Sequence, residues 1–137
     1  MKIPWLIIAL IFGGILVYYN NRKKFQINFY TSLNKTQLQE ELINILELIL
    51  LKHTAQSNFI NTDLDNFEDL KNLIQSYSFG IKNADREKTL KLPFEFHPRG
   101  TFSELAINNF WEKDFIKISS KFNLIYSEYR EKLDNPL

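Results

Sequence analysis

The sequence predicts a mainly α-helical protein in which a single transmembrane helix precedes a small bundle of three or four helices. Two observations carry this expectation. Residues 3–19 contain no charged side chain, and three later stretches repeat apolar residues at steps of three and four, the spacing of one helix face. A third observation, the alternation of apolar and polar residues in two short stretches, allows one short two-stranded β element beside the bundle.

The apolar segment has the length and the flanks of a membrane anchor. As a helix, residues 3–19 would be about 26 Å long, close to the roughly 30 Å hydrocarbon core of a bilayer. Aromatic residues at both ends and basic residues beyond them suit the two membrane–water interfaces. We therefore expect residues 1–24 to form a transmembrane anchor with a basic flank, and six side chains to lie at the membrane interface: Trp5, Tyr18, Tyr19, Arg22, Lys23 and Lys24.

Two other interpretations of this segment are weaker. A cleaved signal peptide should carry small residues just before the cleavage point, and residues 16–21 contain none. A buried core helix rarely lacks polar residues on every face. The expected partner of the segment is thus the lipid bilayer. The basic cluster of residues 22–24, set against Lys2 and the terminal amine, favours the cytoplasmic side for the C-terminal domain.

The remaining residues, 25–137, are expected to form one soluble helical domain. Residues 1–24 hold four of the 17 basic residues and none of the 16 acidic ones, so the domain has a net charge of −3. Affinity for nucleic acid comes mainly from clustered Lys and Arg, so we expect no nucleic-acid partner. The chain has no cysteine, which excludes disulfides and thiolate metal sites.

The first two amphipathic stretches predict two helices. Residues 38–49 would form the first, which is apolar enough to be the centre of the core, with either a Thr36–Gln39 capping box or Asn34 at its start. Residues 64–77 would form the second, capped by Thr62 and stopped at Gly80.

The third stretch predicts a long helical region from Thr101 to about Leu133, opened by a second capping box and broken near Asn108 and Asn109. Its seam is strongly aromatic. The two alternating stretches are residues 25–29, which fit a strand or a continuation of the anchor helix equally well, and residues 90–96. Pro93 cannot donate to a β ladder, so the second would be an edge strand or an extended arm.

The sequence contains no recognised catalytic motif, and we expect no catalytic residue, metal or cofactor. His53 follows an apolar helix, where a protonated imidazole would favour the helix dipole. His97 lies in a Pro-flanked turn, but a general base needs a nucleophile or a substrate group within reach.

The aromatic content fits two interpretations equally well: some of the aromatic side chains are offered to a protein partner at the membrane, or all of them simply fill the core of the bundle. Twelve Phe, six Tyr and two Trp exceed what so small a core requires, and aromatic side chains often anchor interfaces. The leading hypothesis is therefore a membrane-anchored interaction or assembly module. The alternatives are a small membrane-bound enzyme or ligand-binding domain with a pocket between helices, and an immunity or inhibitor protein. The expected partner-facing patch consists of Phe96, His97, Arg99 and Trp111.

Overall fold

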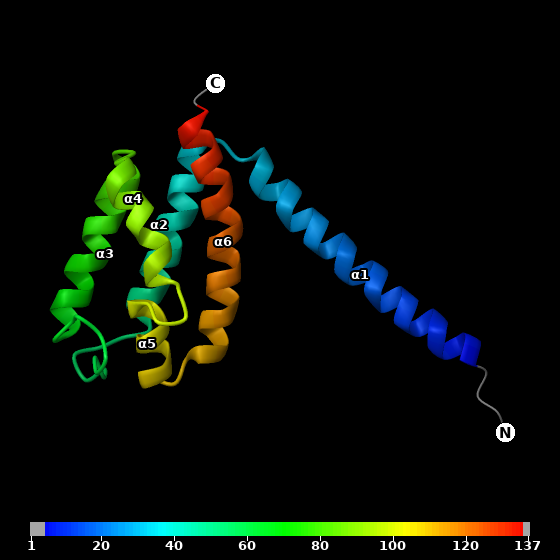
Figure 1. Ribbon diagram of the computed structural model, residues 1–137, viewed down its shortest axis with the longest axis horizontal. Coiled ribbons are helices and arrows are strands. Elements are labelled where there is room, and N and C mark those ends of the chain that lie inside the picture. The colour runs from blue at the N-terminus through cyan, green and yellow to red at the C-terminus, as the bar shows by residue number, and fades with distance from the viewer. Residues whose placement is uncertain (1–4, 136–137) are drawn as a thin grey trace. The chain divides into compact units, whose positions relative to one another are not determined.

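The computed structural model describes residues 5–135, and every regular element in that range is a helix (Figure 1). The mainly helical class is confirmed. The chain divides into two compact units, Met1–Leu33 and Asn34–Leu137. Lys2, which enters the orientation argument, lies outside the described residues.

The first unit is a single helix, α1 (Trp5–Ser32). It is long and apolar enough to cross a membrane, by length and composition. Its 28 residues give a length of about 42 Å, more than the roughly 30 Å of a hydrocarbon core. Residues 25–29, for which a strand and a continuation of the anchor helix were equally expected, belong to this helix. Thr31 Oγ1 donates to Ile27 O, four residues earlier, and Ser32 Oγ donates to Phe29 O, three residues earlier. Both spacings are those of a helical backbone.

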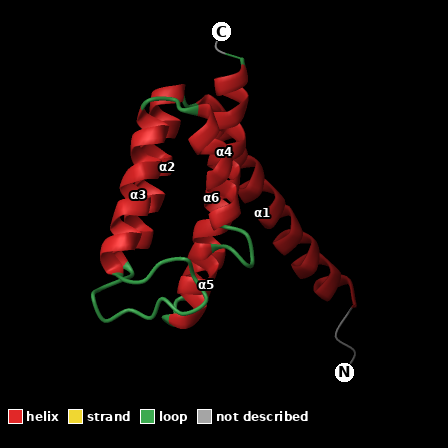
Figure 2. Cartoon of the chain, turned by 60° about the vertical axis from the view of Figure 1, so that its left-hand side comes forward, coloured by secondary structure: helices red, strands yellow, loops and turns green. Residues whose placement is uncertain are grey.

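The second unit contains five helices, more than the three or four expected: α2 (Lys35–Leu51), α3 (Phe67–Lys82), α4 (Arg86–Glu95), α5 (Thr101–Asn108) and α6 (Glu112–Asp134). Helix α2 packs against both α3 and α6, while α4 packs against α3 and α5, and α5 against α6 (Figure 2). The number of helices is higher than expected because residues 90–95 belong to α4 and because the third stretch separates into α5 and α6.

Helix α2 forms the centre of this unit. Its start is fixed by the Asn34–Gln37 capping box, because Asn34 Oδ1 accepts from the Gln37 N–H at 2.8 Å and Gln37 Oε1 accepts from the Asn34 N–H at 2.9 Å. Gln39, expected in the alternative box, instead donates to Ile81 O at the end of α3. Because α2 packs against both α3 and α6, it needs an apolar face toward each of them. Its buried residues are Leu38, Leu42, Ile45, Leu46 and Ile49.

Helix α3 begins and ends later than expected. Its cap is Asn66, whose Oδ1 accepts from the Asp69 N–H at 2.9 Å, and not Thr62. Gly80 lies inside the helix rather than at its end. A Cβ at Gly80 would come within 3.0 Å of Lys88 Cβ, so the glycine allows α3 and α4 to approach closely.

Aromatic rings fill much of the core of the second unit. The Phe96 ring stacks on Phe122 with 3.8 Å between centroids and meets Phe102 edge-on at 5.1 Å. Phe122, Phe102 and Tyr129 are almost completely buried. The unusually aromatic seam predicted for the last stretch is therefore largely a core seam.

Helix α4 corrects the predicted strand at residues 90–96. Pro93 lacks the N–H that would bond to the carbonyl of Thr89, one turn earlier. Tyr126 of α6 donates its O–H to this carbonyl at 2.9 Å. The vacant acceptor thus has a partner from another helix, and the helix continues through Pro93 to Glu95. Sequence rules for proline consider only the local ladder and miss such a donor.

We predict that Tyr126→Phe lowers the free energy of unfolding by about 1–2 kcal/mol, because the Thr89 carbonyl loses its partner in a buried position. In a Pro93→Ala background the restored N–H can satisfy that carbonyl, so the same change should cost less than half as much. Denaturant unfolding of the four proteins forms the double-mutant cycle. Equal costs in both backgrounds would show that the N–H restored by Pro93→Ala does not replace the Tyr126 donor at the Thr89 carbonyl.

Candidate functional site

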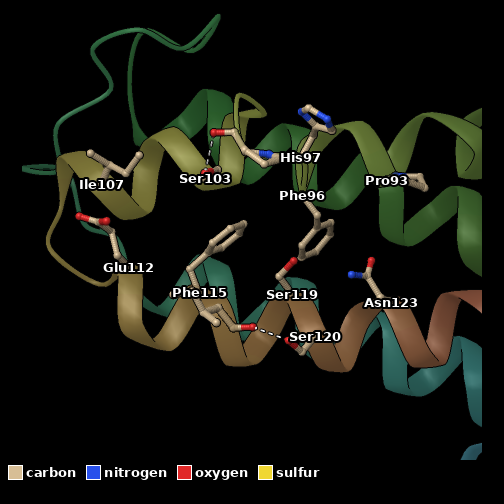
Figure 3. Close-up of a pocket in the computed structure, with 12 residues that line it drawn as sticks. Pro93, Phe96, His97, Ser103, Ile107, Glu112, Phe115, Ser119, Ser120 and Asn123 are labelled. Atoms are coloured by element: carbon tan, nitrogen blue, oxygen red, sulfur yellow. Dashed lines mark hydrogen bonds between the residues drawn. The ribbon is translucent and has the colours of Figure 1, made fainter. Parts of the chain in front are cut away.

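An open groove of about 560 Å³ lies between α6 and the segment that runs from Pro93 through α5 (Figure 3). Its lining residues come from the end of α4, the turn that follows, α5 and the first half of α6: Pro93, Phe96, His97, Pro98, Ser103, Ile107, Glu112, Phe115, Ile116, Ser119, Ser120 and Asn123.

The turn after α4 is set by Gly100. A Cβ at this position would lie 2.2 Å from Phe94 O, so only glycine fits between the turn and the end of α4. The Gly100 N–H donates to His97 O at 2.7 Å and closes the turn. Gly100 is also the cap residue of α5, in place of the predicted Thr101–Glu104 capping box. This turn brings α5 back alongside α6 and opens the groove between them.

The interior of the groove is apolar. Phe96 and Phe115 form its floor and are nearly buried, with nearly parallel rings whose centroids are 6.4 Å apart. Ile107 and Ile116 lie along its walls with 45% and 66% of their surfaces exposed. Two large aliphatic side chains therefore face water beside an aromatic floor, an arrangement that favours an apolar occupant.

Four polar side chains that line the groove, those of His97, Ser103, Glu112 and Ser120, do not converge on one point. Ser103 Oγ donates to Pro98 O at 3.0 Å and Ser120 Oγ donates to Ile116 O at 2.9 Å, so both hydroxyls have partners in the chain. Figure 3 shows the His97 ring pointing away from α6, while Glu112 lies at the other end of the groove beside Ile107. General acid–base catalysis needs two positioned groups near one point, and these two are separated. Across residues 5–135, no three His, Asp or Glu side chains are grouped to hold a metal ion.

The four residues of the expected partner-facing patch fall in different environments. Phe96 and Trp111 are only 5% and 7% exposed, whereas His97 and Arg99 are exposed. Phe96 and His97 line the groove, whereas Trp111 does not line it and is buried against His53 and Phe115. They do not form one continuous exposed surface, and their role in partner binding stays a prediction.

The six residues expected at the membrane interface all lie on α1 with exposed side chains. The two aromatic ends, Trp5 and the pair Tyr18 and Tyr19, are separated by helix that carries only apolar residues and glycine. Their location at an interface also stays a prediction.

Trp111 is held by a buried hydrogen-bond chain. Its indole N–H donates to His53 Nε2 at 3.2 Å, and His53 Nδ1–H donates to Ile49 O at 2.8 Å. These two bonds require a neutral imidazole with its proton on Nδ1. Burial lowers the pKa of His53, partly opposed by the bond to Ile49 O. His53 therefore bonds a carbonyl in the last turn of α2, as expected for a residue that caps this helix end, but it does so as a neutral imidazole and not as the expected protonated one.

The corner between α5 and α6 contains a residue that sequence reasoning missed. Phe110 has φ 63° and is 95% exposed. The predicted break at Asn108 and Asn109 is confirmed, and Asn109 fastens the corner: its Oδ1 accepts from the Asn58 N–H at 2.7 Å and its Nδ2 donates to Asn58 O at 2.9 Å. The break was visible in the sequence, but nothing there marks Phe110 as exposed.

Comparison with protein-family models, curated proteins and solved structures found no match. The function proposed below consequently rests on the chain's own geometry.

We predict that acidification destabilises the second unit through His53. Because its pKa in the folded state is below the ordinary value of 6.5, the unfolded chain takes up the proton first as the pH falls. The stabilising contribution is thus present above about pH 6.5 and is lost as the pH falls toward the lowered pKa. Unfolding free energies at pH 7.5 and 5.5 should differ more for the wild type than for His53→Gln.

His97→Gln is the matched control for this measurement, because His97 is exposed and makes none of the His53 contacts. It should retain the wild-type pH dependence. If His53→Gln retains it as well, other groups cause the acid sensitivity.

Proposed function

We propose that the chain is a membrane-tethered protein-interaction module, in which α1 is a single-pass anchor and the groove binds an apolar segment of a protein. The observation that carries this proposal is the groove itself, with an aromatic floor, two exposed isoleucines on its walls and polar groups that do not converge.

The anchor is supported by the surface of α1. Its large apolar side chains are exposed along the helix. No part of its most hydrophobic stretch is buried within the structure. Each large aliphatic or aromatic side chain gains about 1.5–3 kcal/mol when it leaves water. A bilayer supplies that environment for every face of the helix at once, and by the positive-inside rule the basic residues 22–24 favour the cytoplasmic side for the second unit.

A tether changes what the groove must achieve. Restriction to the membrane plane raises the effective concentration of neighbouring membrane proteins, so a modest apolar contact is sufficient. Ile107 and Ile116 offer the exposed area, and the nearly buried Phe96 and Phe115 beneath them give the contact a rigid base. Such central aromatic and aliphatic clusters, surrounded by a polar rim, carry most of the free energy in protein interfaces.

A small-molecule enzyme is less well supported. Ligand pockets combine an apolar wall with a few polar groups aimed at one point. In this groove His97 and Glu112 lie apart, and the hydroxyls of Ser103 and Ser120 are bonded to backbone carbonyls. An immunity or inhibitor protein is one member of the proposed class, since it also acts by binding another protein.

The tether predicts that the mature protein retains residues 1–24 and resists extraction from membranes by alkaline carbonate. Intact-mass measurement of the extracted pellet checks both points together. A soluble product that starts between Tyr18 and Phe25 would mean that the segment is a cleaved signal peptide.

The groove predicts a discrete protein adduct when a photo-crosslinking amino acid replaces Ser120 in the full-length chain in native membranes. The same amino acid at Gln75, exposed on α3, serves as the position control and should give none. Ile116→Glu should suppress the Ser120 adduct at least several-fold, because a carboxylate replaces an apolar wall.

Phe79→Glu is the matched substitution, since Phe79 is 65% exposed on α3 and does not line the groove. It should leave the adduct and the melting temperature nearly unchanged. Equal adducts at Ser120 and Gln75, or lipid adducts alone, would contradict a protein-binding groove.

A further inference from the structure

The ring of Phe110 is held in water by a strained backbone. Helix α5 ends in a Schellman motif, in which the Trp111 N–H donates to Ala106 O at 2.9 Å and Phe110 occupies the left-handed position that glycine usually fills. A bulky residue with positive φ is a conformational outlier. At 95% exposure, burial of the ring does not offset this cost.

The end of α3 provides an internal comparison. The Asp85 N–H donates to Gly80 O at 2.8 Å, and Ala84 takes the same left-handed position with φ 51°. A small residue stands there, and Asn61, with φ 62°, is a type that tolerates this region. Among the described residues, Phe110 is thus the bulky exception, and strain of this kind concentrates at functional sites.

The corner that carries Phe110 is rigid. Asn109 is bonded to Asn58 on both of its amide atoms, and Trp111 is buried against His53. The backbone that carries the ring is therefore held in place, which lowers the entropic cost of the ring's use as an anchor in an interface.

The exposed ring lies directly beside the groove. Glu112 lines both the groove and the surface hollow around Phe110, and Ile107, on the groove wall, precedes Phe110 by three residues. A single surface patch thus contains a projecting aromatic ring and an apolar groove of about 560 Å³.

We propose that the occupant of the groove is Phe110 of a second copy of this chain, and that two copies pair reciprocally, each ring in the groove of the other. The inference rests on the proposed function of the groove. An interface with two-fold symmetry needs one patch that complements itself, and this patch supplies both halves. Asp114 is already paired with Lys52 of the same chain at 2.6 Å, which leaves Glu112 and Lys113, of opposite sign, beside the ring to meet their counterparts in the second copy.

A lipid surface suits this corner less well. The three charged residues that follow the ring, together with Lys52, which is paired with Asp114, have no net charge, whereas anionic membrane surfaces recruit clusters of Lys and Arg. A common membrane plane, by contrast, raises the effective concentration of copies for each other.

The absence of cysteine from the sequence allows a direct test. Full-length chains with two different tags are mixed and reconstituted in phospholipid vesicles, one with Lys113→Cys beside the ring and the other with Ser119→Cys in the groove. A short bismaleimide should link the two species. The pair of Lys113→Cys with Gln75→Cys on α3 should give at least tenfold less product.

Phe110→Gly should reduce the linked product at least tenfold and leave the melting temperature equal to or above that of the wild type, because the strained position then holds glycine. Ala84→Gly relaxes the same motif at α3 and should retain the product. This comparison separates loss of the ring from any general effect of a glycine.

Each remaining outcome overturns the inference. Undiminished linkage with Phe110→Gly means that the copies meet through another surface, such as α1. If Lys113→Cys and Ser119→Cys are not linked, but the Ser120 photo-crosslink captures a different protein, the pairing of two copies is wrong and the proposed function stands. Absence of both the linkage and the adduct sinks both.

Discussion

The missing N–H of Pro93 is the constraint on which much of the second unit depends. It leaves the Thr89 carbonyl without its helical partner, and Tyr126 supplies one from the neighbouring α6. This bond ties α4 to α6 at the level of the proline, so the helix ends two residues later at Glu95 with a fixed direction. The turn closed by Gly100 then follows, and with it the return path of α5. The groove depends on these three features in turn: the Tyr126 bond that fixes the end of α4, the turn closed by Gly100, and the return of α5 alongside α6.

The same arrangement explains why one aromatic residue serves two purposes. Phe96 comes directly after α4 and stacks on Phe122 of α6, which secures the end of the helix to the core. Its ring is also part of the groove floor. A surface built on a core residue is rigid, since the side chains beneath it are close-packed. It is equally sensitive, because any change that loosens the core alters the floor.

The sequence predicted what local spacing encodes. The apolar period located α2, α3 and α6, and the paired asparagines located the corner between α5 and α6. Prediction from the sequence failed where a residue distant in the chain determines the local structure or the protonation state. The period-two pattern of residues 90–96 indicated a strand, but the donor that makes a helix possible there is 37 residues from Thr89 along the chain. His53 was expected to be charged because its position after a helix was visible, whereas Trp111, 58 residues away, was not. Of the expected patch, only Phe96 and His97 line the groove. Phe96 and Trp111 are buried, and their burial follows from tertiary packing, which local spacing does not encode.

Helix α2 joins two chemically different ends of the second unit. Asn34, where the chain arrives from the first unit, caps one end, and His53, bonded to Trp111 at the Phe110 corner, follows the other. The 17 residues of α2 measure about 25 Å as a helix. Helix α2 therefore sets the distance between Asn34, where the first unit is attached, and the corner that carries Phe110, and it does so as a helix rather than as a flexible linker. Insertion of one helical turn in this helix would change its length by about 5.4 Å, so natural variation in the length of α2 should be far rarer than variation in its exposed side chains.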